Sequence, residues 1–345
     1  MPHRLHLLVL FLGVIVASGA ASAADQPTAQ ARYLQDELVR AAEAKNWTRM
    51  IEVGLQLHPM NPRGGSTAFN LALAYEQSGD PAKAAEWLVT AGRDGFAGAT
   101  VVSTTPELEN ARKQPRYKEA IELIRANRAR QFEAFKAEAE KTEPMVILPP
   151  RYDPSKPAPL IIALHGTGGT GKQMADAWRA TASRFGAVLV CPDALRPAGS
   201  GYHWMFIDES EWLVLRTLEW TKTKYPIDDS KVILTGFSQG ANVTMQVTTK
   251  HPDLFDGAIV CCGHYEPHAQ PLPEKPPARW PRYVLLTGEH DEGAASNRQF
   301  ADLIRSRGGE VDLHIYKGMG HSLPKAREKE FKDAVDFALG TSRGR

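Results

Sequence analysis

A serine framed by two glycines is the first feature of this sequence that could do chemistry. Residues 236–240 read Gly-Phe-Ser-Gln-Gly, a G-x-S-x-G pattern centred on Ser238. The apolar run 232–234 precedes it and a helix-like stretch, residues 241–250, follows. A sharp turn between strand and helix exposes such a serine, and the glycines leave room for neighbouring backbone. Ser238 is therefore the candidate nucleophile, and the positive end of the helix would favour an oxyanion beside it.

His321 is the candidate base, because a serine hydroxyl is a weak nucleophile until a base takes its proton. Among 11 histidines it is the one in Gly-Met-Gly-His-Ser, residues 318–322, between the last predicted strand and a predicted final helix over 326–339. This position fits the chain order serine, acid, histidine. The alternative is a surface-loop histidine with no catalytic role.

The third member of such a site is a carboxylate that orients the imidazole. Asp291 follows the predicted strand 283–287 in the loop Gly-Glu-His-Asp. Glu289 and Glu292 are rivals in the same loop. We favour Asp291 because the acid in this arrangement occupies the turn after the strand.

Donors for an oxyanion are expected in residues 164–169, Leu-His-Gly-Thr-Gly-Gly, directly after a strongly apolar run. We expect the backbone N–H groups of Thr167 and Gln239 to form this oxyanion hole. His165 is expected to be structural. The loop is not a phosphate-binding loop, because Lys172 is followed by glutamine where that motif requires serine or threonine.

Two insertions bear on the substrate. Residues 199–212 are rich in aromatics, and Tyr202 and Trp204 are the candidate substrate-binding residues of an acyl or aryl pocket. Residues 266–281 are rich in proline and predict a surface loop rather than a large mobile lid.

The elements that must position these residues alternate between short β-branched runs and helical stretches. Such alternation predicts the α/β class, with a mostly parallel sheet flanked by helices. The predicted strands are residues 160–164, 187–191, 231–235, 257–262, 283–287 and 311–316. The α/β domain that carries these motifs is expected over residues 146–341.

A small all-α domain, residues 25–128, is expected before it. Residues 31–96 show an internal period of 34 that is similar to the tetratricopeptide repeat, although Gly54 stands where a large apolar residue is usual. A helix over residues 117–140 is expected to cap the repeats, and residues 129–145 to connect the domains. The helical domain either braces the hydrolase or offers a groove to a partner protein.

The N-terminus predicts export. Residues 5–16 are nearly all apolar and Ala-Ser-Ala at 21–23 is a cleavage pattern, so residues 1–23 read as a signal peptide. The run is too short for a membrane anchor, which needs about 20 apolar residues. We therefore expect a periplasmic or secreted protein with no transmembrane segment in the mature chain.

Composition limits the function classes. The 345 residues are 43% hydrophobic and 23% charged with a formal net charge of +1, which is typical of globular protein and gives no basic footprint for nucleic acid. The three cysteines, Cys191, Cys261 and Cys262, are expected to be buried small side chains. No metal-ligand pattern is present, and no cofactor is expected.

Residues 146–340 resemble the α/β-hydrolase superfamily, within it the carboxylesterase and phospholipase branch and the secreted depolymerase and feruloyl-esterase-like group. The resemblance rests on Leu-His-Gly-x-Gly, Gly-Phe-Ser-Gln-Gly, a Gly-x-x-Asp turn and a Gly-x-Gly-His turn, in that order. It implies hydrolysis of a small-molecule or polymer-borne carboxylic ester through an acyl-serine. The alternatives are a peptidase or lactonase with the same triad, or a non-catalytic interaction protein that uses its helical repeats.

Overall fold

The computed structural model describes residues 28–61, 64–267 and 270–341. The predicted signal peptide, residues 1–23, lies outside them. The chain divides into two compact units, Met1–Lys136 and Ala137–Arg345. The division falls inside helix α7 (Tyr117–Ala139), within the segment predicted to connect the domains. No helix in the described part of the chain is long and apolar enough to span a membrane.

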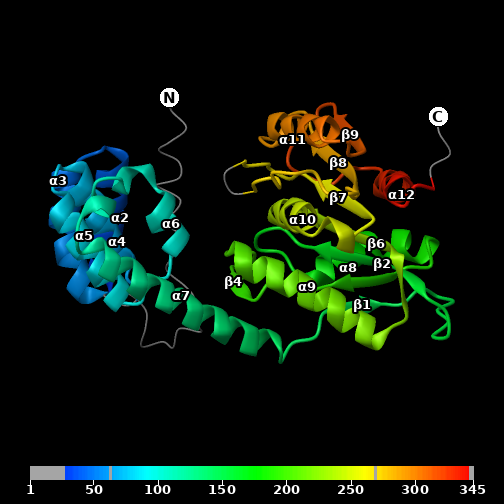
Figure 1. Ribbon diagram of the computed structural model, residues 1–345, viewed down its shortest axis with the longest axis horizontal. Helices are drawn as coiled ribbons and strands as arrows, with labels where there is room; N and C mark the ends of the chain where they lie inside the picture. The colour runs from blue at the N-terminus through cyan, green and yellow to red at the C-terminus, as the bar shows by residue number, and fades with distance from the viewer. Residues whose placement is uncertain (1–27, 62–63, 268–269, 342–345) are drawn as a thin grey trace. The chain divides into compact units, whose positions relative to one another are not determined.

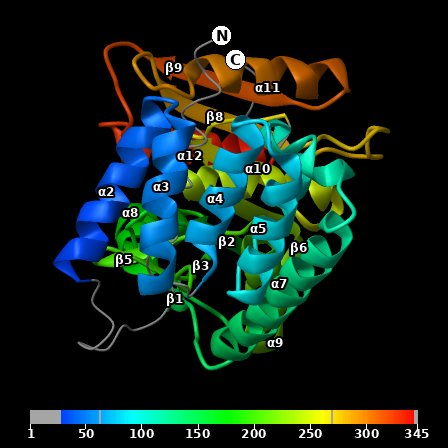
Figure 2. The same ribbon diagram turned by 90° about the vertical axis from the view of Figure 1, so that its left-hand side faces the viewer.

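The first unit is helical, as predicted. Its first four α-helices lie side by side in chain order (Figure 2). The elements are α2 (Ala29–Glu43), α3 (Trp47–Leu57), η2 (His58–Met60), α4 (Ser66–Gln77), α5 (Pro81–Arg93), α6 (Ala99–Thr104), η3 (Pro106–Leu108), η4 (Ala111–Lys113) and α7.

Helix α4 is buried on nearly all sides because α3 and α5 pack against it. Its alanines, such as Ala68 and Ala72, let the neighbouring backbones approach closely. Gly54 of α3 has the same effect, since a Cβ there would lie 2.7 Å from Leu71 Cδ2. The departure at Gly54 from the repeat pattern therefore makes room for Leu71.

Helix α7 closes this unit in the place of the predicted capping helix. Ala120, Ile121 and Ile124 pack into the core that α4 and α5 form. The buried side-chain amide of Asn127 donates hydrogen bonds to the carbonyl oxygens of Gly92 and Phe96, at 2.6 and 2.8 Å. These two bonds join α7 to the C-terminal end of α5 and to the segment that follows it.

The second unit contains a seven-stranded sheet in the order β1-β3-β2-β6-β7-β8-β9, in which only β1 is antiparallel to its neighbour (Figure 1). All six predicted strands are present in it. The strands are β1 (Met145–Ile147), β2 (Ala158–Leu164), β3 (Val188–Cys191), β6 (Ile227–Phe237), β7 (Gly257–Cys261), β8 (Arg282–Gly288) and β9 (Val311–Tyr316).

Helices cover both faces of this sheet. Helices α8 and α12 pack on one face, where Trp178 and Phe331 stack at a centroid distance of 4.0 Å. Helices α10 and α11 pack on the other face, and α9 lies beside α10. The bounds are α8 (Gly171–Arg184), α9 (Ile207–Lys224), α10 (Gln239–Lys250), η5 (Pro252–Leu254), α11 (Ala294–Ser306) and α12 (Arg327–Ala338).

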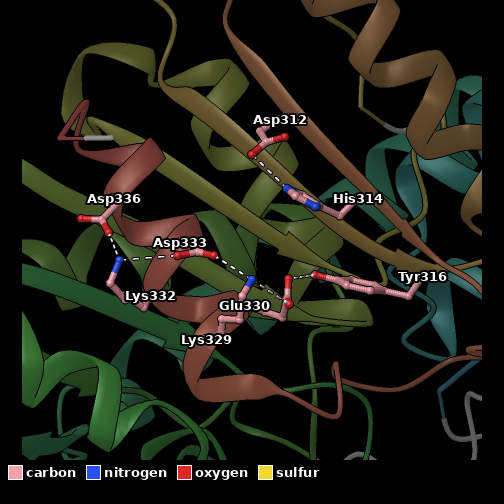
Figure 3. A network of polar contacts seen from close by, with 8 residues as sticks. All are labelled: Asp312, His314, Tyr316, Lys329, Glu330, Lys332, Asp333 and Asp336. Atoms are coloured by element: carbon pink, nitrogen blue, oxygen red, sulfur yellow. Dashed lines mark hydrogen bonds and ion pairs between the residues drawn. The ribbon is translucent and has the colours of Figure 1, made fainter. Parts of the chain in front are cut away.

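A polar network joins the edge strand β9 to α12 (Figure 3). The phenol of Tyr316 donates a hydrogen bond of 2.6 Å to Glu330. Lys329 and Lys332 continue the network along α12 through ion pairs with Asp333. The two ends of the loop 317–326, which carries His321, are thereby held together.

The aromatic insertion forms a short hairpin that the sequence did not predict. It consists of β4 (Arg196–Ala198) and β5 (Gly201–His203). An ion pair of 2.6 Å between the partly exposed Arg196 and the buried Glu209 fixes the hairpin to the first turn of α9. The hairpin lies against the loop after β2, because Tyr202 forms a bridge with Gly169.

Candidate active site

Four adjacent strands end at one edge of the sheet, and each delivers a residue to the same place. Ser238 follows β6, Cys262 follows β7, Asp291 follows β8 and His321 follows β9. The loop after β2, the other neighbour of β6, adds Thr167. This is the edge where parallel α/β sheets generally bind ligands.

Ser238 occupies a strained turn between β6 and α10. Its φ is 55° and its ψ is −119°, a backbone conformation that residues with a side chain rarely adopt. A Cβ at Gly236 would overlap the carbonyl oxygen of Gly240, and a Cβ at Gly240 would lie 2.5 Å from the carbonyl oxygen of Leu164. The two glycines therefore allow the turn, as the motif predicts.

The three predicted side chains lie in one hydrogen-bonded line. His321 Nε2 is 2.8 Å from Ser238 Oγ, and His321 Nδ1 is 2.6 Å from Asp291 Oδ2. A neutral imidazole with its proton on Nδ1 satisfies both contacts, because Nε2 then accepts from the serine hydroxyl. The carboxylate side chain is 2% exposed and the imidazole 52% exposed, so the candidate base is accessible while the candidate acid is not.

Two of the rival acids on the loop after β8, Asp291 and Glu289, make different hydrogen bonds. Asp291 also accepts a hydrogen bond of 2.7 Å from the Gly293 N–H, which fixes its second oxygen. Glu289 instead accepts from the Gly318 N–H at 2.9 Å and holds the loop that carries His321. The two carboxylates thus have different partners, and only Asp291 contacts the imidazole of His321.

The predicted oxyanion loop lies beside the serine. Thr167 is exposed, and its hydroxyl donates to Gln239 Oε1 at 3.1 Å. Within the described residues, no acceptor is found for the backbone N–H of Thr167 or of Gln239. Both N–H groups therefore remain available to a substrate oxygen.

His165 has structural partners. Its Nδ1–H donates to the Gly166 carbonyl at 2.7 Å, and its Nε2 accepts from the Ala194 N–H at 3.0 Å. The contact at Nε2 requires a neutral ring, because Nε2 accepts there, and burial favours that form by lowering the pKa of His165. His165 therefore shapes the loop rather than exchanging protons.

The two predicted substrate-binding residues differ in exposure. Tyr202 is half-buried, whereas Trp204 is 5% exposed and its indole N–H donates to the His165 carbonyl at 2.9 Å. Trp204 therefore packs behind the oxyanion loop. Tyr202 remains the more accessible of the two.

Cys262 is a neighbour of the triad that the sequence did not predict. It has a φ of 53° and is 3% exposed, and burial raises the pKa of its thiol to about 12. Its sulfur lies within 4.8 Å of ligand atoms of both Asp291 and His321. The three could ligate a metal, but Asp291 and His321 already bind each other. Cys191 and Cys261 are buried as expected.

This combination of a mostly parallel sheet, flanking helices and a serine on a strand-to-helix turn defines the α/β-hydrolase fold, a class rich in serine hydrolases. Residues 213–338 match the family model described as phospholipase/carboxylesterase. This match covers the C-terminal part of the second unit and is similar to the resemblance that the sequence motifs indicate.

Parts of the chain are also similar to known proteins. A feruloyl esterase B of Talaromyces stipitatus is 34% identical over 130 residues, which are 34% of this chain; the chain spans 35% of the length of that relative. A carboxylesterase of Mesorhizobium loti is 18% identical with a TM-score of 0.43, over 51% of this chain and 87% of that chain. A carboxylesterase of Bacillus cereus is 16% identical with a TM-score of 0.45, over 59% and 99%.

Proposed function

We propose that this protein hydrolyses carboxylic esters with Ser238 as nucleophile, His321 as general base and Asp291 as the orienting acid. The observation that carries the proposal is the line of hydrogen bonds from Ser238 through His321 to Asp291, built on a serine at positive φ. The family match and the feruloyl esterase relative support the ester as the substrate class.

The mechanism follows from the geometry. His321 Nε2 takes the Ser238 proton while Oγ attacks the ester carbonyl, whose electron pair moves onto oxygen. The N–H groups of Thr167 and Gln239 bind this oxyanion, and the positive end of α10 adds to its stabilisation. When the tetrahedral species collapses, the alkoxide leaves with the proton from His321, and the acyl group stays on Ser238.

The second half repeats these steps with water. His321 deprotonates a water molecule as it attacks the acyl-serine, and the same two N–H groups hold the second oxyanion. Collapse releases the carboxylic acid and returns the proton to Ser238. Asp291 stabilises the imidazolium in both halves while its carboxylate stays ionised.

The decisive experiment uses the purified mature chain beside Ser238→Ala. We expect the wild type to hydrolyse p-nitrophenyl acetate and butyrate, and a fluorophosphonate to label Ser238 as read by mass spectrometry. The variant should do neither. A folded wild type that neither hydrolyses nor labels would refute the mechanism and favour the interaction-protein alternative.

For substrate class, we propose short-chain or aryl esters, including esters borne on polymers. The half-buried Tyr202 beside the oxyanion loop and the relative's name support this choice. Methyl ferulate, p-nitrophenyl butyrate, p-nitrophenyl palmitate and a matched anilide form the test panel. Faster turnover of the palmitate or of the anilide than of the two favoured esters would contradict the proposal.

We further propose export with cleavage near Ala23, on the strength of the apolar run and the small residues before it. The mass of the chain recovered from the periplasm or medium tests this proposal. A chain that keeps residues 1–23 and stays in the cytoplasm would contradict it.

A further inference from the structure

The side chain of Gln239 turns away from the reacting serine and contacts two other segments. Its Oε1 accepts hydrogen bonds from the Trp204 N–H at 2.8 Å and from the Thr167 hydroxyl at 3.1 Å. Its Nε2 donates to the Trp204 carbonyl at 3.0 Å. The backbone of Trp204 offers one donor and one acceptor, so only one orientation of the amide satisfies all three contacts.

The same backbone segment holds the oxyanion loop directly. The Gly168 N–H donates to the Tyr202 carbonyl at 2.8 Å, and the Tyr202 N–H donates to the Gly169 carbonyl at 3.0 Å. The indole of Trp204 adds its bond to the His165 carbonyl. Residues 165–169 are thus bound to residues 202–204, and Gln239 binds both segments.

This arrangement matters because the two oxyanion donors come from segments far apart in the chain. Thr167 and Gln239 are separated by 72 residues. Their N–H groups stabilise an oxyanion only if both already point at the place where it forms. Contacts between the two segments therefore set the geometry of the hole.

The backbone role of Gln239 does not require a glutamine. Any residue except proline at this position of G-x-S-x-G would supply the N–H, so the amide side chain has a separate task. Its polar atoms are half-buried and all make contacts with the loop or with the hairpin segment.

We propose that the Gln239 side chain is a positioning residue, a clamp that fixes the Thr167 N–H against the Gln239 N–H before substrate binds. The clamp rests on the proposed function, because it matters to catalysis only if an oxyanion forms at Ser238. It acts through Thr167 and Trp204 and does not touch His321 or Asp291.

The test compares Gln239→Met and Thr167→Val with a control, Gln246→Met, in the full mature chain. Methionine keeps the length and the backbone N–H of residue 239 but removes the amide. Thr167→Val removes only the hydroxyl contact, and it still tests the clamp if Gln239→Met folds poorly. Gln246 lies on the same helix and donates to the Ile207 carbonyl at 3.3 Å, away from the oxyanion loop.

We expect Gln239→Met to lower kcat about tenfold or more, less than the ~10²–10³ lost when a donor is removed outright. KM should change little. The inhibition constant of an alkyl trifluoromethyl ketone, whose serine adduct carries an oxyanion, should rise by the same factor as kcat/KM falls. The pH profile of kcat/KM should keep its wild-type midpoint, because His321 and Asp291 are untouched. Thr167→Val should show a smaller change in the same direction, and Gln246→Met none in kcat or inhibition.

The clamp would be overturned if Gln239→Met kept the wild-type kcat and inhibition constant. It would also be overturned if kcat of Gln239→Met fell without a matching rise in the inhibition constant, or if Gln246→Met lost as much kcat as Gln239→Met. Failure of the proposed function looks different. In that case the wild type itself neither hydrolyses esters nor reacts with a fluorophosphonate at Ser238, and the clamp is refuted with it.

Discussion

The thiol of Cys262 donates a hydrogen bond of 3.2 Å to the carbonyl oxygen of Ser322, the residue after the candidate base. This bond joins the end of β7 to the loop that carries His321. Cys262 is 3% exposed, and its sulfur lies within 4.8 Å of ligand atoms of Asp291 and His321. A buried thiol thus helps to hold the loop.

We predict that iodoacetamide leaves all three cysteines of the folded protein unmodified at about pH 8. Only the thiolate reacts, and burial raises the pKa of the Cys262 thiol to about 12 and raises those of Cys191 and Cys261 as well. Mass spectrometry should detect no adduct on the folded protein and three adducts on the protein treated after denaturation. An adduct at Cys262 under native conditions would contradict this burial.

Asp291→Asn is expected to lower kcat about 10⁴-fold, because an amide favours the wrong tautomer of His321. Glu289→Gln is the matched control. Its side chain can still accept from the Gly318 N–H, so we expect less than about a tenfold loss. Steady-state kinetics on p-nitrophenyl butyrate measure both, and a larger loss in Glu289→Gln would reverse the assignment of the acid.

Much of the second unit could be predicted because several of its strands, β2, β3, β7 and β8, are almost fully buried. Such strands are continuous apolar runs, as residues 160–164 are, and the chemistry-bearing residues follow their ends. The missed strands β1, β4 and β5 have three residues each, and β4 contains Pro197, so neither length nor alternation distinguished them from loops.

The missed parts of the site depend on contacts between distant segments. No local sequence pattern predicts the hydrogen bond between Cys262 and Ser322, or the one between Gln239 and Trp204. The partners in each pair are distant in the sequence, and the order of strands in the sheet brings them together. Motif and chain order therefore predict the reacting groups, while the groups that hold them emerge only from the fold.

Stability should depend on pH at the exposed edge of β9. His314 Nε2 lies 2.9 Å from Asp312 Oδ2, and this contact raises the pKa of His314 (Figure 3). A raised pKa in the folded state adds stability that is complete below the unfolded pKa and is lost as pH rises through the folded value. Both side chains are about 40% exposed, so solvent screens the pair.

Asp312→Asn should therefore lower the free energy of unfolding more at about pH 5.5 than at about pH 9. The two decreases should differ by roughly 0.5 kcal/mol. Urea denaturation at the two pH values measures the difference. His314→Gln should remove the pH dependence of the Asp312→Asn effect. An equal effect of Asp312→Asn at both pH values would show that the pair does not contribute.

Arg196→Met should destabilise the hydrolase unit by about 3 kcal/mol. The variant takes away the guanidinium that contacts Glu209, whose side chain is 3% exposed, and a buried carboxylate is costly without its cation. The double variant Arg196→Met/Glu209→Leu should recover part of the loss. Urea denaturation of the three chains measures this, and a double variant less stable than Arg196→Met would contradict the argument.

Strand β1 has a consequence for any attempt to separate the two units. Met145–Ile147 pairs with β3 and so covers the outer side of that strand. A shortened chain that began at Pro149 would leave β3 as a bare, strongly apolar edge, open to pairing with another molecule. A cut before Thr142 keeps β1 on β3 and also keeps the Thr142 carbonyl that accepts from Arg216, so the hydrolase unit should then stay soluble alone.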